Sequence, residues 1–225
     1  MKILKETNKT KVLHIKIPKN GTHSINKVLI DKDCWKREYF FGHDPLYVLK
    51  KNNSIDENVF IFCVSRNPYT RFFSQYNQLV RTLKEYENKT NIDFCLDIEN
   101  KNLHPVFVSP QVSWISTEKN NILPIKSSFY NMNNSIYENY NFSGDLEAIK
   151  INKIYRLENI CDFESDFEVK LSNDNKTDYC NSRYKKFFTE EVINFVKKYY
   201  ETDFLFFNYD FDFHKSISFR FSYTS

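Results

Sequence analysis

A short loop carries a lysine, a glycine and two hydroxyl side chains. It spans residues 17–24 (IPKNGTHS) and includes Lys19, Gly21, Thr22 and Ser24. Backbone N–H groups at the start of a helix, with a lysine and hydroxyl donors beside them, attract an anion. The loop therefore indicates a phosphate-like site, with an ordinary strand-to-helix turn as the structural alternative. It is not a Walker A loop, because its lysine precedes its glycine.

A second candidate anion site lies in residues 65–76 (SRNPYTRFFSQY). The planar guanidinium of Arg66 can bind a phosphate through parallel hydrogen bonds. Ser74 follows eight residues later, about one and a half turns into a helix, and offers a hydroxyl donor. Taken singly, Arg66 could instead form a surface salt bridge and Ser74 could be a small packing residue. Arg71 is expected to form a structural ion pair or to contact a substrate.

Both candidate sites follow a predicted strand and precede a predicted helix. Residues 12–17 alternate around β-branched and aliphatic positions, and residues 24–30 have apolar residues at helical spacing. Residues 58–65 (NVFIFCVS) are typical of a strand buried on both faces, and an amphipathic helix begins at Tyr69. Two such units predict an α/β fold with a parallel sheet, whose ligands bind at the carboxyl ends of the strands.

The rest of the chain is less regular. Residues 88–145 are rich in Asn and Ser and contain prolines that interrupt any long element, as substrate loops often do. Residues 153–157 predict a third strand, and residues 172–179 predict a mobile loop. Thr189 resembles the N-cap of a closing helix, since two glutamates and an apolar face follow it.

Composition limits the class of protein. The chain has 225 residues, of which 41% are hydrophobic, and a net charge of +3, too small for a protein that coats nucleic acid. We expect a single domain over residues 1–225, with a core at about 11–211. No apolar run approaches the roughly 18 residues of a membrane span, so a cytoplasmic or otherwise soluble location is expected. The cysteines lack a Cys-x-x-Cys pair, so no metal site is expected.

The two anion motifs together resemble those of the sulfotransferases that use 3′-phosphoadenosine-5′-phosphosulfate (PAPS). Residues 17–24 are similar to their 5′-phosphosulfate loop, and residues 65–76 to their 3′-phosphate motif, Arg-[Asp/Asn]-Pro-x-x-Arg-x-x-Ser-x-Tyr. The resemblance implies a three-layer sandwich with a central parallel sheet and a P-loop-like nucleotide-binding fold. The cofactor-binding candidates are the residues that the resemblance implies or that lie within the matched loops: Lys19, Asn20, Gly21, Thr22, His23, Ser24, Arg66 and Ser74. Arg183 is a further candidate, because its charge could close over the 3′-phosphate; it could instead belong to a solvated run of charges.

Other segments resemble the glycan O-sulfotransferases related to the heparan sulfate 2-O- and 6-O-enzymes. Residues 42–44 (Gly-His-Asp) are similar to their Gly-His element, and residues 104–114 to their His-x-x-Pro-Gln substrate segment. Residues 155–163 and 200–209 resemble two later motifs. The resemblance implies a hydroxyl-bearing acceptor, most simply a carbohydrate. The acceptor-contact candidates are His104, Gln111 and Trp114, each of which could instead be a loop or core residue.

In the predicted reaction, His43 is the general base, because an imidazole titrates near neutral pH and stands at the position that the resemblance indicates. His43 could also be a structural histidine. Lys19 would stabilise the leaving group, 3′-phosphoadenosine-5′-phosphate (PAP), during an in-line displacement. The chemistry so described requires no metal.

Two other functions stay open at this point. The chain could be a nucleotide-dependent phosphotransferase, which would use Lys19 and Arg66 on phosphates, but no Walker A loop or Mg²⁺-ligand set is evident. It could also be a catalytically inactive module that binds a nucleotide or a glycan, although it keeps His43 beside the anion residues. A glycan, a tyrosine, a lipid and a small alcohol all present a hydroxyl, so the sequence does not identify the acceptor. The oligomeric state is equally undetermined.

Overall fold

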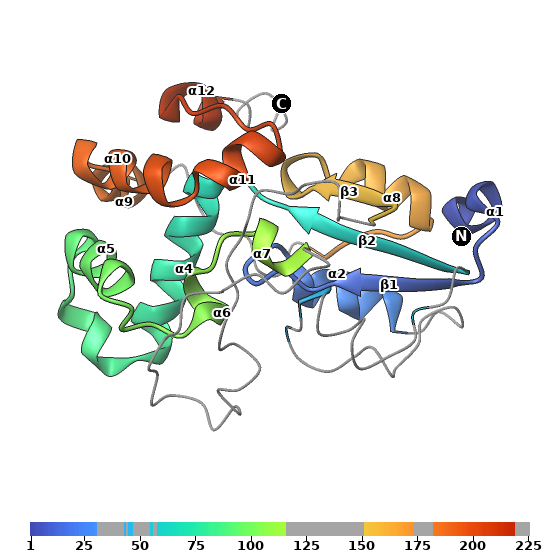
Figure 1. Ribbon diagram of the computed structural model, residues 1–225, viewed down its shortest axis with the longest axis horizontal. Coiled ribbons are helices and arrows are strands. Elements are labelled where there is room, and N and C mark those ends of the chain that lie inside the picture. The colour runs from blue at the N-terminus through green and yellow to red at the C-terminus, as the bar shows by residue number, and fades with distance from the viewer. Residues whose placement is uncertain are drawn as a thin grey trace. The chain divides into compact units, whose positions relative to one another are not determined.

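The structure is a computed structural model that describes residues 1–30, 43, 45, 46, 55, 58–115, 151–172 and 182–218 (Figure 1). Contacts divide the chain into two compact units, each of which combines segments far apart in the sequence. Among the described residues, the first unit contains those up to residue 66 together with 113–115 and 151–172, and the second contains 67–112 and 182–218. A single domain over the whole chain stays a prediction. No described helix has the length and apolar character needed to cross a bilayer.

A three-stranded parallel sheet, in the order β1–β2–β3, forms the centre of the first unit. The strands are β1 (Lys11–Ile15), β2 (Val59–Ser65) and β3 (Lys153–Arg156). The central strand, β2, is buried along its whole length, as its continuous apolar run predicts. Parallel pairing brings the carboxyl ends of all three strands to one edge of the sheet. This mixed architecture agrees with the predicted α/β class.

Three described helices of the first unit pack on one face of this sheet. Alternate residues of a strand point to the same face, and Phe60 and Phe62 share one apolar cluster with residues of α1 (Lys2–Thr7), α2 (Thr22–Leu29) and α8 (Cys161–Phe167). Phe62 connects the sheet to α8 in this cluster, because its ring lies 5.0 Å from that of Phe167. A short 3-10 helix, η5 (Leu157–Asn159), connects β3 to α8.

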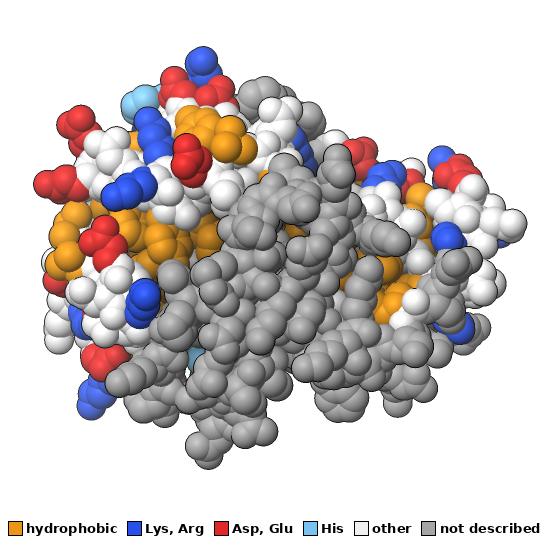
Figure 2. Space-filling view, in the orientation of Figure 1, with side chains coloured by type: hydrophobic (Ala, Val, Ile, Leu, Met, Phe, Trp, Pro, Cys, Tyr) orange, Lys and Arg blue, Asp and Glu red, His pale blue; other side chains and the backbone are white. Residues whose placement is uncertain are grey.

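Helices around an aromatic core make up the described part of the second unit. The longest, α4 (Pro68–Thr82), begins at Pro68 and is capped by Asn67, whose side chain accepts the N–H groups of Tyr69 (3.0 Å) and Thr70 (3.4 Å). The other elements of this part are η2 (Lys84–Asn88), α5 (Asn91–Glu99), α6 (Pro105–Val108), α9 (Ser182–Phe187), α10 (Glu190–Tyr199), α11 (Glu201–Phe206) and α12 (Phe213–Ser218). The short helix α7 (Val112–Ile115) begins where the chain passes from the second unit to the first. In the described part of the surface seen in Figure 2, Lys and Arg side chains are interspersed with Asp and Glu.

Most predicted elements are confirmed, and one region is more helical than expected. The Thr189 cap is confirmed, because its hydroxyl oxygen accepts the N–H of Val192 at 3.4 Å. Within residues 88–115 the structure shows helix α5, whose first turn is fixed by a reciprocal capping box between Thr90 and Asp93. That Thr-x-x-acid pattern was the sequence signal for this helix. Residues 116–145 of the predicted irregular region and residues 173–179 of the predicted loop lie outside the described residues.

Burial gives His14 of β1 an unusual acid–base behaviour. Its side chain is 3% exposed, its ring stacks on Phe62 at 4.8 Å, and its Nδ1 lies 3.2 Å from the Asn26 side-chain oxygen. Desolvation lowers the pKa of His14 from 6.5 to about 3, against the smaller opposing effect of the Asn26 hydrogen bond. The imidazole is therefore a neutral part of the core at physiological pH.

This burial predicts that His14 makes the fold sensitive to mild acid. Below pH 6.5 the unfolded chain binds a proton that the folded chain excludes until about pH 3, so stability contributed by neutral His14 falls as the pH drops. The loss between about pH 6.5 and about pH 5 is about 2 kcal/mol. His14→Gln, which cannot titrate, should lack this part of the change in the free energy of unfolding between about pH 7 and about pH 5, measured by urea unfolding at both pH values. An equal change in the variant and the wild type would contradict the role assigned to His14.

Candidate functional site

The loop of the first candidate anion site and Arg66 of the second meet at the carboxyl edge of the sheet, within the first unit. The loop after β1 and Arg66, which follows β2, are adjacent there, because the Arg66 guanidinium donates a hydrogen bond to the carbonyl of Lys19. The Asn20 side chain donates to the carbonyl of Val64, the penultimate residue of β2, at 2.6 Å. Arg66 and Asn20 are 6% and 1% exposed. The structure thus brings Lys19, Asn20 and Arg66 together.

The backbone of the loop has the geometry of an anion cradle. Lys19 and Gly21 both have positive φ, 69° and 76°, and alternation of this kind directs successive N–H groups toward one point. Helix α2 begins immediately afterwards with Gly21 as its N-cap and no side-chain cap. Within the described residues, the N–H groups of Thr22, His23 and Ser24 have no acceptor. The loop therefore presents main-chain donors, and the positive φ of Lys19 is uncommon for a residue with a side chain.

Side chains within the loop hold its shape. The Thr22 hydroxyl donates to the carbonyl of Ile17 at 3.0 Å, so its proton is engaged inside the loop. Gly21 leaves space for Leu157 of η5: a Cβ at this position would lie 2.9 Å from the Leu157 Cδ1. Thr22 was predicted to donate to a ligand, and Leu157 was not among the predicted site residues. In the structure both residues support the loop, Thr22 from within it and Leu157 from η5.

His43 is held beside the entry to the loop. Its Nδ1 lies 2.7 Å from the carbonyl oxygen of Lys16, which can only accept, so Nδ1 carries the proton of the neutral ring and Nε2 is the basic nitrogen. The ring of Trp114, in α7, meets the His43 ring edge-on with centroids 6.3 Å apart. Trp114 is fully buried, which favours packing of its indole against His43 over open stacking on a sugar. Gly42 and Asp44 lie outside the described residues.

The remaining predicted site residues belong to the second unit. Ser74 lies in α4 and is 7% exposed, and Arg183 lies in α9 with its side chain in solvent. His104 is buried, its Nδ1 accepts the N–H of Val106 at 3.2 Å, and burial lowers its pKa. Gln111 is fully buried, and its N–H donates to Asp203. Their predicted contacts with a cofactor or an acceptor stay predictions.

Three residues with structural roles were not among the predicted site residues, although Leu157 and Asp203 lie in the segments 155–163 and 200–209 that resemble sulfotransferase motifs. Lys16 supplies the carbonyl that orients His43, yet any residue could supply a carbonyl. Leu157 packs under Gly21, and Asp203 holds the main chain at Gln111, through contacts between segments remote in the sequence. Among the residues that the structure describes, no group of three His, Cys, Asp or Glu side chains could hold a metal ion.

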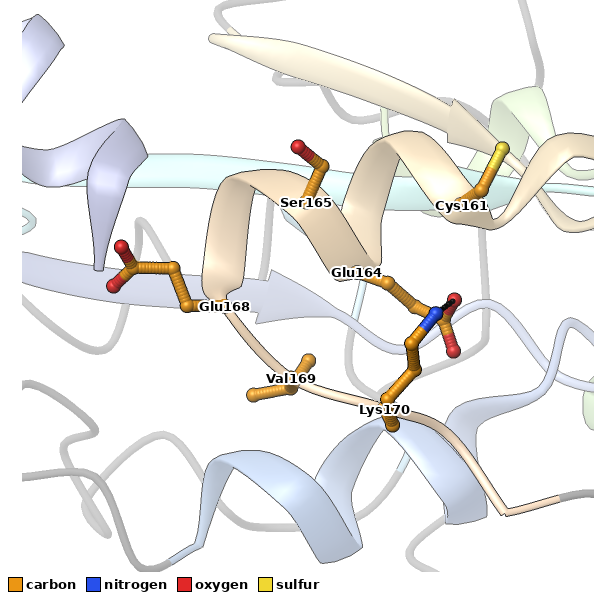
Figure 3. A pocket seen from close by; sticks show the side chains of 6 residues that line it. All are labelled: Cys161, Glu164, Ser165, Glu168, Val169 and Lys170. Atoms are coloured by element: carbon orange, nitrogen blue, oxygen red, sulfur yellow. Dashed lines mark hydrogen bonds and ion pairs between the residues drawn. The ribbon is translucent and has the colours of Figure 1, made fainter.

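A surface hollow lies at helix α8 (Figure 3). It is lined by residues 161, 164, 165 and 168–170, and Figure 3 shows the ion pair between Lys170 and Glu164, 3.1 Å long, at its rim. None of the predicted site residues lines it. The hollow therefore adds nothing to the candidate site.

Comparison of the chain with protein-family models, with curated proteins and with solved structures gives no match. The resemblance of the motifs to those of sulfotransferases thus stays a prediction.

The loop geometry predicts that Gly21 tolerates asparagine better than alanine. Both residues add a Cβ near Leu157, but asparagine adopts positive φ more readily than alanine. Gly21→Ala is expected to lower the free energy of unfolding by about 1–3 kcal/mol, and Gly21→Asn by less. Urea unfolding of both variants measures the difference. If the two variants lose equal stability, contact with Leu157 rather than backbone conformation decides the need for glycine.

Proposed function

We propose that this chain is a PAPS-dependent sulfotransferase that transfers a sulfuryl group to a hydroxyl, in the first instance of a carbohydrate. The observation that carries the proposal is the junction of the N–H cradle at Lys19–Ser24 with Arg66, in the same unit as a histidine whose Nε2 is basic. The proposal includes the three-layer sandwich, the P-loop-like nucleotide-binding fold and the single domain that the motifs imply.

The donor set fits a ligand that carries two anionic groups. The main-chain N–H groups of residues 22–24 and the Lys19 ammonium suit a 5′-phosphosulfate, because helix-terminal donors and a lysine bind such oxygens without further partners. Arg66 follows the neighbouring strand and suits the 3′-phosphate, with Ser74 as a second proposed donor. When bound, PAPS supplies the sulfuryl group and a bisphosphate leaving group.

The chain's own residues would then hold charge and move one proton. His43 would accept the proton of the acceptor hydroxyl at Nε2. Its Nδ1–H bond to the Lys16 carbonyl strengthens as the ring becomes cationic, so the carbonyl favours this proton transfer. Lys19 and the loop N–H groups would stabilise negative charge that grows on the leaving phosphate. Hydrolysis of the sulfuryl donor is avoided only if the acceptor is ordered beside His43. The proposal gives this role to the segment that carries His104 and Gln111, while Trp114 would act by packing against His43 rather than by stacking on the acceptor.

The cradle predicts saturable binding of PAP, measurable by calorimetry on the full chain. Lys19→Ala should weaken binding about tenfold or more, since one charged donor is lost. Arg66→Lys keeps the charge but loses the planar fork, and the fork also holds the Lys19 carbonyl, so a similar loss is expected. Lys27→Ala is the matched control, because it removes one exposed positive charge from the last turn of α2.

Two calorimetric outcomes would count against the proposal. Wild-type chain that binds ATP with Mg²⁺ but not PAP supports a phosphotransferase instead. PAP binding that survives both Lys19→Ala and Arg66→Lys unchanged places the nucleotide elsewhere.

The His43 geometry predicts loss of turnover without loss of nucleotide binding. Transfer of radiolabelled sulfate from PAPS, screened across glycan, tyrosine-peptide, lipid and small-alcohol acceptors, measures activity and identifies the acceptor class. His43→Ala should reduce transfer about a hundredfold or more, with PAP affinity unchanged within about twofold. A variant that transfers sulfate at the wild-type rate removes His43 as the base. A wild-type chain that binds PAP but transfers nothing to any acceptor supports the inactive binding module.

A further inference from the structure

Two side chains near the end of the second unit hold a short stretch of main chain. The Tyr200 hydroxyl donates to the carbonyl of Val108 at 2.7 Å. The two carboxylate oxygens of Asp203 accept the N–H groups of Gln111 and Val112, at 2.8 and 3.0 Å. Tyr200 and Asp203 are three residues apart at the start of α11, so they lie on the same side of that helix. We call this pair the Tyr200–Asp203 clamp.

The clamp is buried and charged. Tyr200 is 1% exposed and Asp203 is fully buried. Burial raises the pKa of Asp203 to about 6, while Arg71 of α4 and the hydrogen bonds from residues 111 and 112 act in the opposite direction. Arg71 is itself 1% exposed, with its guanidinium carbon 5.9 Å from the centre of the Tyr200 ring. Well-packed apolar residues often stabilise a core as well as a buried carboxylate and its charged partner do. Stability alone therefore does not account for the buried Asp203 and Arg71.

The held stretch lies inside the segment predicted to meet the acceptor. Residues 104–114 carry His104, Gln111 and Trp114, the three acceptor-contact candidates. The carboxylate holds the N–H of Val112, the first residue of α7, and Trp114 of the same helix lies edge-on to His43. The main chain that Asp203 fixes therefore continues directly into the helix that contacts the proposed base.

We propose that Tyr200 and Asp203 are positioning residues that fix the main chain of the acceptor segment, residues 104–114, for sulfuryl transfer. This inference rests on the proposed sulfotransferase function and deepens it. Neither side chain is assigned contact with the donor or with the reacting atoms. Loss of the clamp should accordingly raise the KM for the acceptor and leave PAP binding intact.

The test compares Asp203→Asn with Glu201→Gln. The amide of Asp203→Asn keeps the shape of the carboxylate, but its NH₂ group faces one of the two N–H donors and repels it. Glu201→Gln is the matched control, because it removes one negative charge from the same turn of α11 at an exposed position. Tyr200→Phe removes a single hydroxyl and serves as the second variant should Asp203→Asn fail to fold.

Amide exchange and kinetics give independent readouts. In Asp203→Asn, hydrogen exchange at residues 111 and 112, followed by NMR, should accelerate about tenfold or more. The KM for the acceptor, with desulfated heparan sulfate or the class found in the transfer screen as probe, should rise about tenfold. Calorimetric PAP affinity should stay within about twofold of wild type, and Glu201→Gln should match wild type in all three measurements. Tyr200→Phe should show a smaller change in the same direction.

The outcomes separate the two proposals. Unchanged exchange at residues 111 and 112 in the variants overturns the clamp, whatever the activity. Faster exchange with an unchanged acceptor KM overturns its positioning role, because the segment would then be held for stability alone. A wild-type chain that binds PAP and transfers no sulfate overturns the proposed function, and the acceptor role of the clamp with it.

Discussion

The parallel pairing of β2 with both of its neighbours is the constraint on which the candidate site depends. A strand buried along its whole length and paired on both edges cannot shift register without exposing apolar side chains and losing a ladder of hydrogen bonds. Its register fixes where β1 and β3 end. The loop after β1, Arg66 after β2 and η5 after β3 therefore emerge at one edge. Arg66 and Leu157 reach the loop from the ends of β2 and β3.

At this edge, most polar side chains support the backbone rather than face outward. Asn20 binds the carbonyl of Val64, Thr22 binds that of Ile17, and Arg66 binds that of Lys19. What the loop leaves available is main-chain N–H groups, which are rigidly placed and need no reorganisation when an anion arrives. Preorganisation of this kind suits a ligand whose charge changes during a reaction.

Local patterns predicted much of this arrangement, and long-range contacts account for the rest. The continuous apolar run of β2, the amphipathic α4 and the Thr189 cap were each visible because a single segment contains the whole signal. The pairing of the Lys19 loop with Arg66 followed from the rule that parallel strands end together. Leu157 under Gly21 and the Asp203 bonds to residues 111 and 112 join segments about ninety or more residues apart, and no local spacing encodes them. Helix α5 had a local signal in its capping box that the irregular composition of its surroundings concealed.

The hydrogen bond between His43 and the Lys16 carbonyl links the histidine to the position of the chain that enters the loop. Lys16 lies in the chain that enters the cradle, so any movement of that chain displaces the acceptor of the Nδ1–H. If the cradle binds an anion as proposed, a binding event that moves this chain changes the proton affinity of His43, and by reciprocal linkage protonation of His43 changes the affinity for the anion by the same factor.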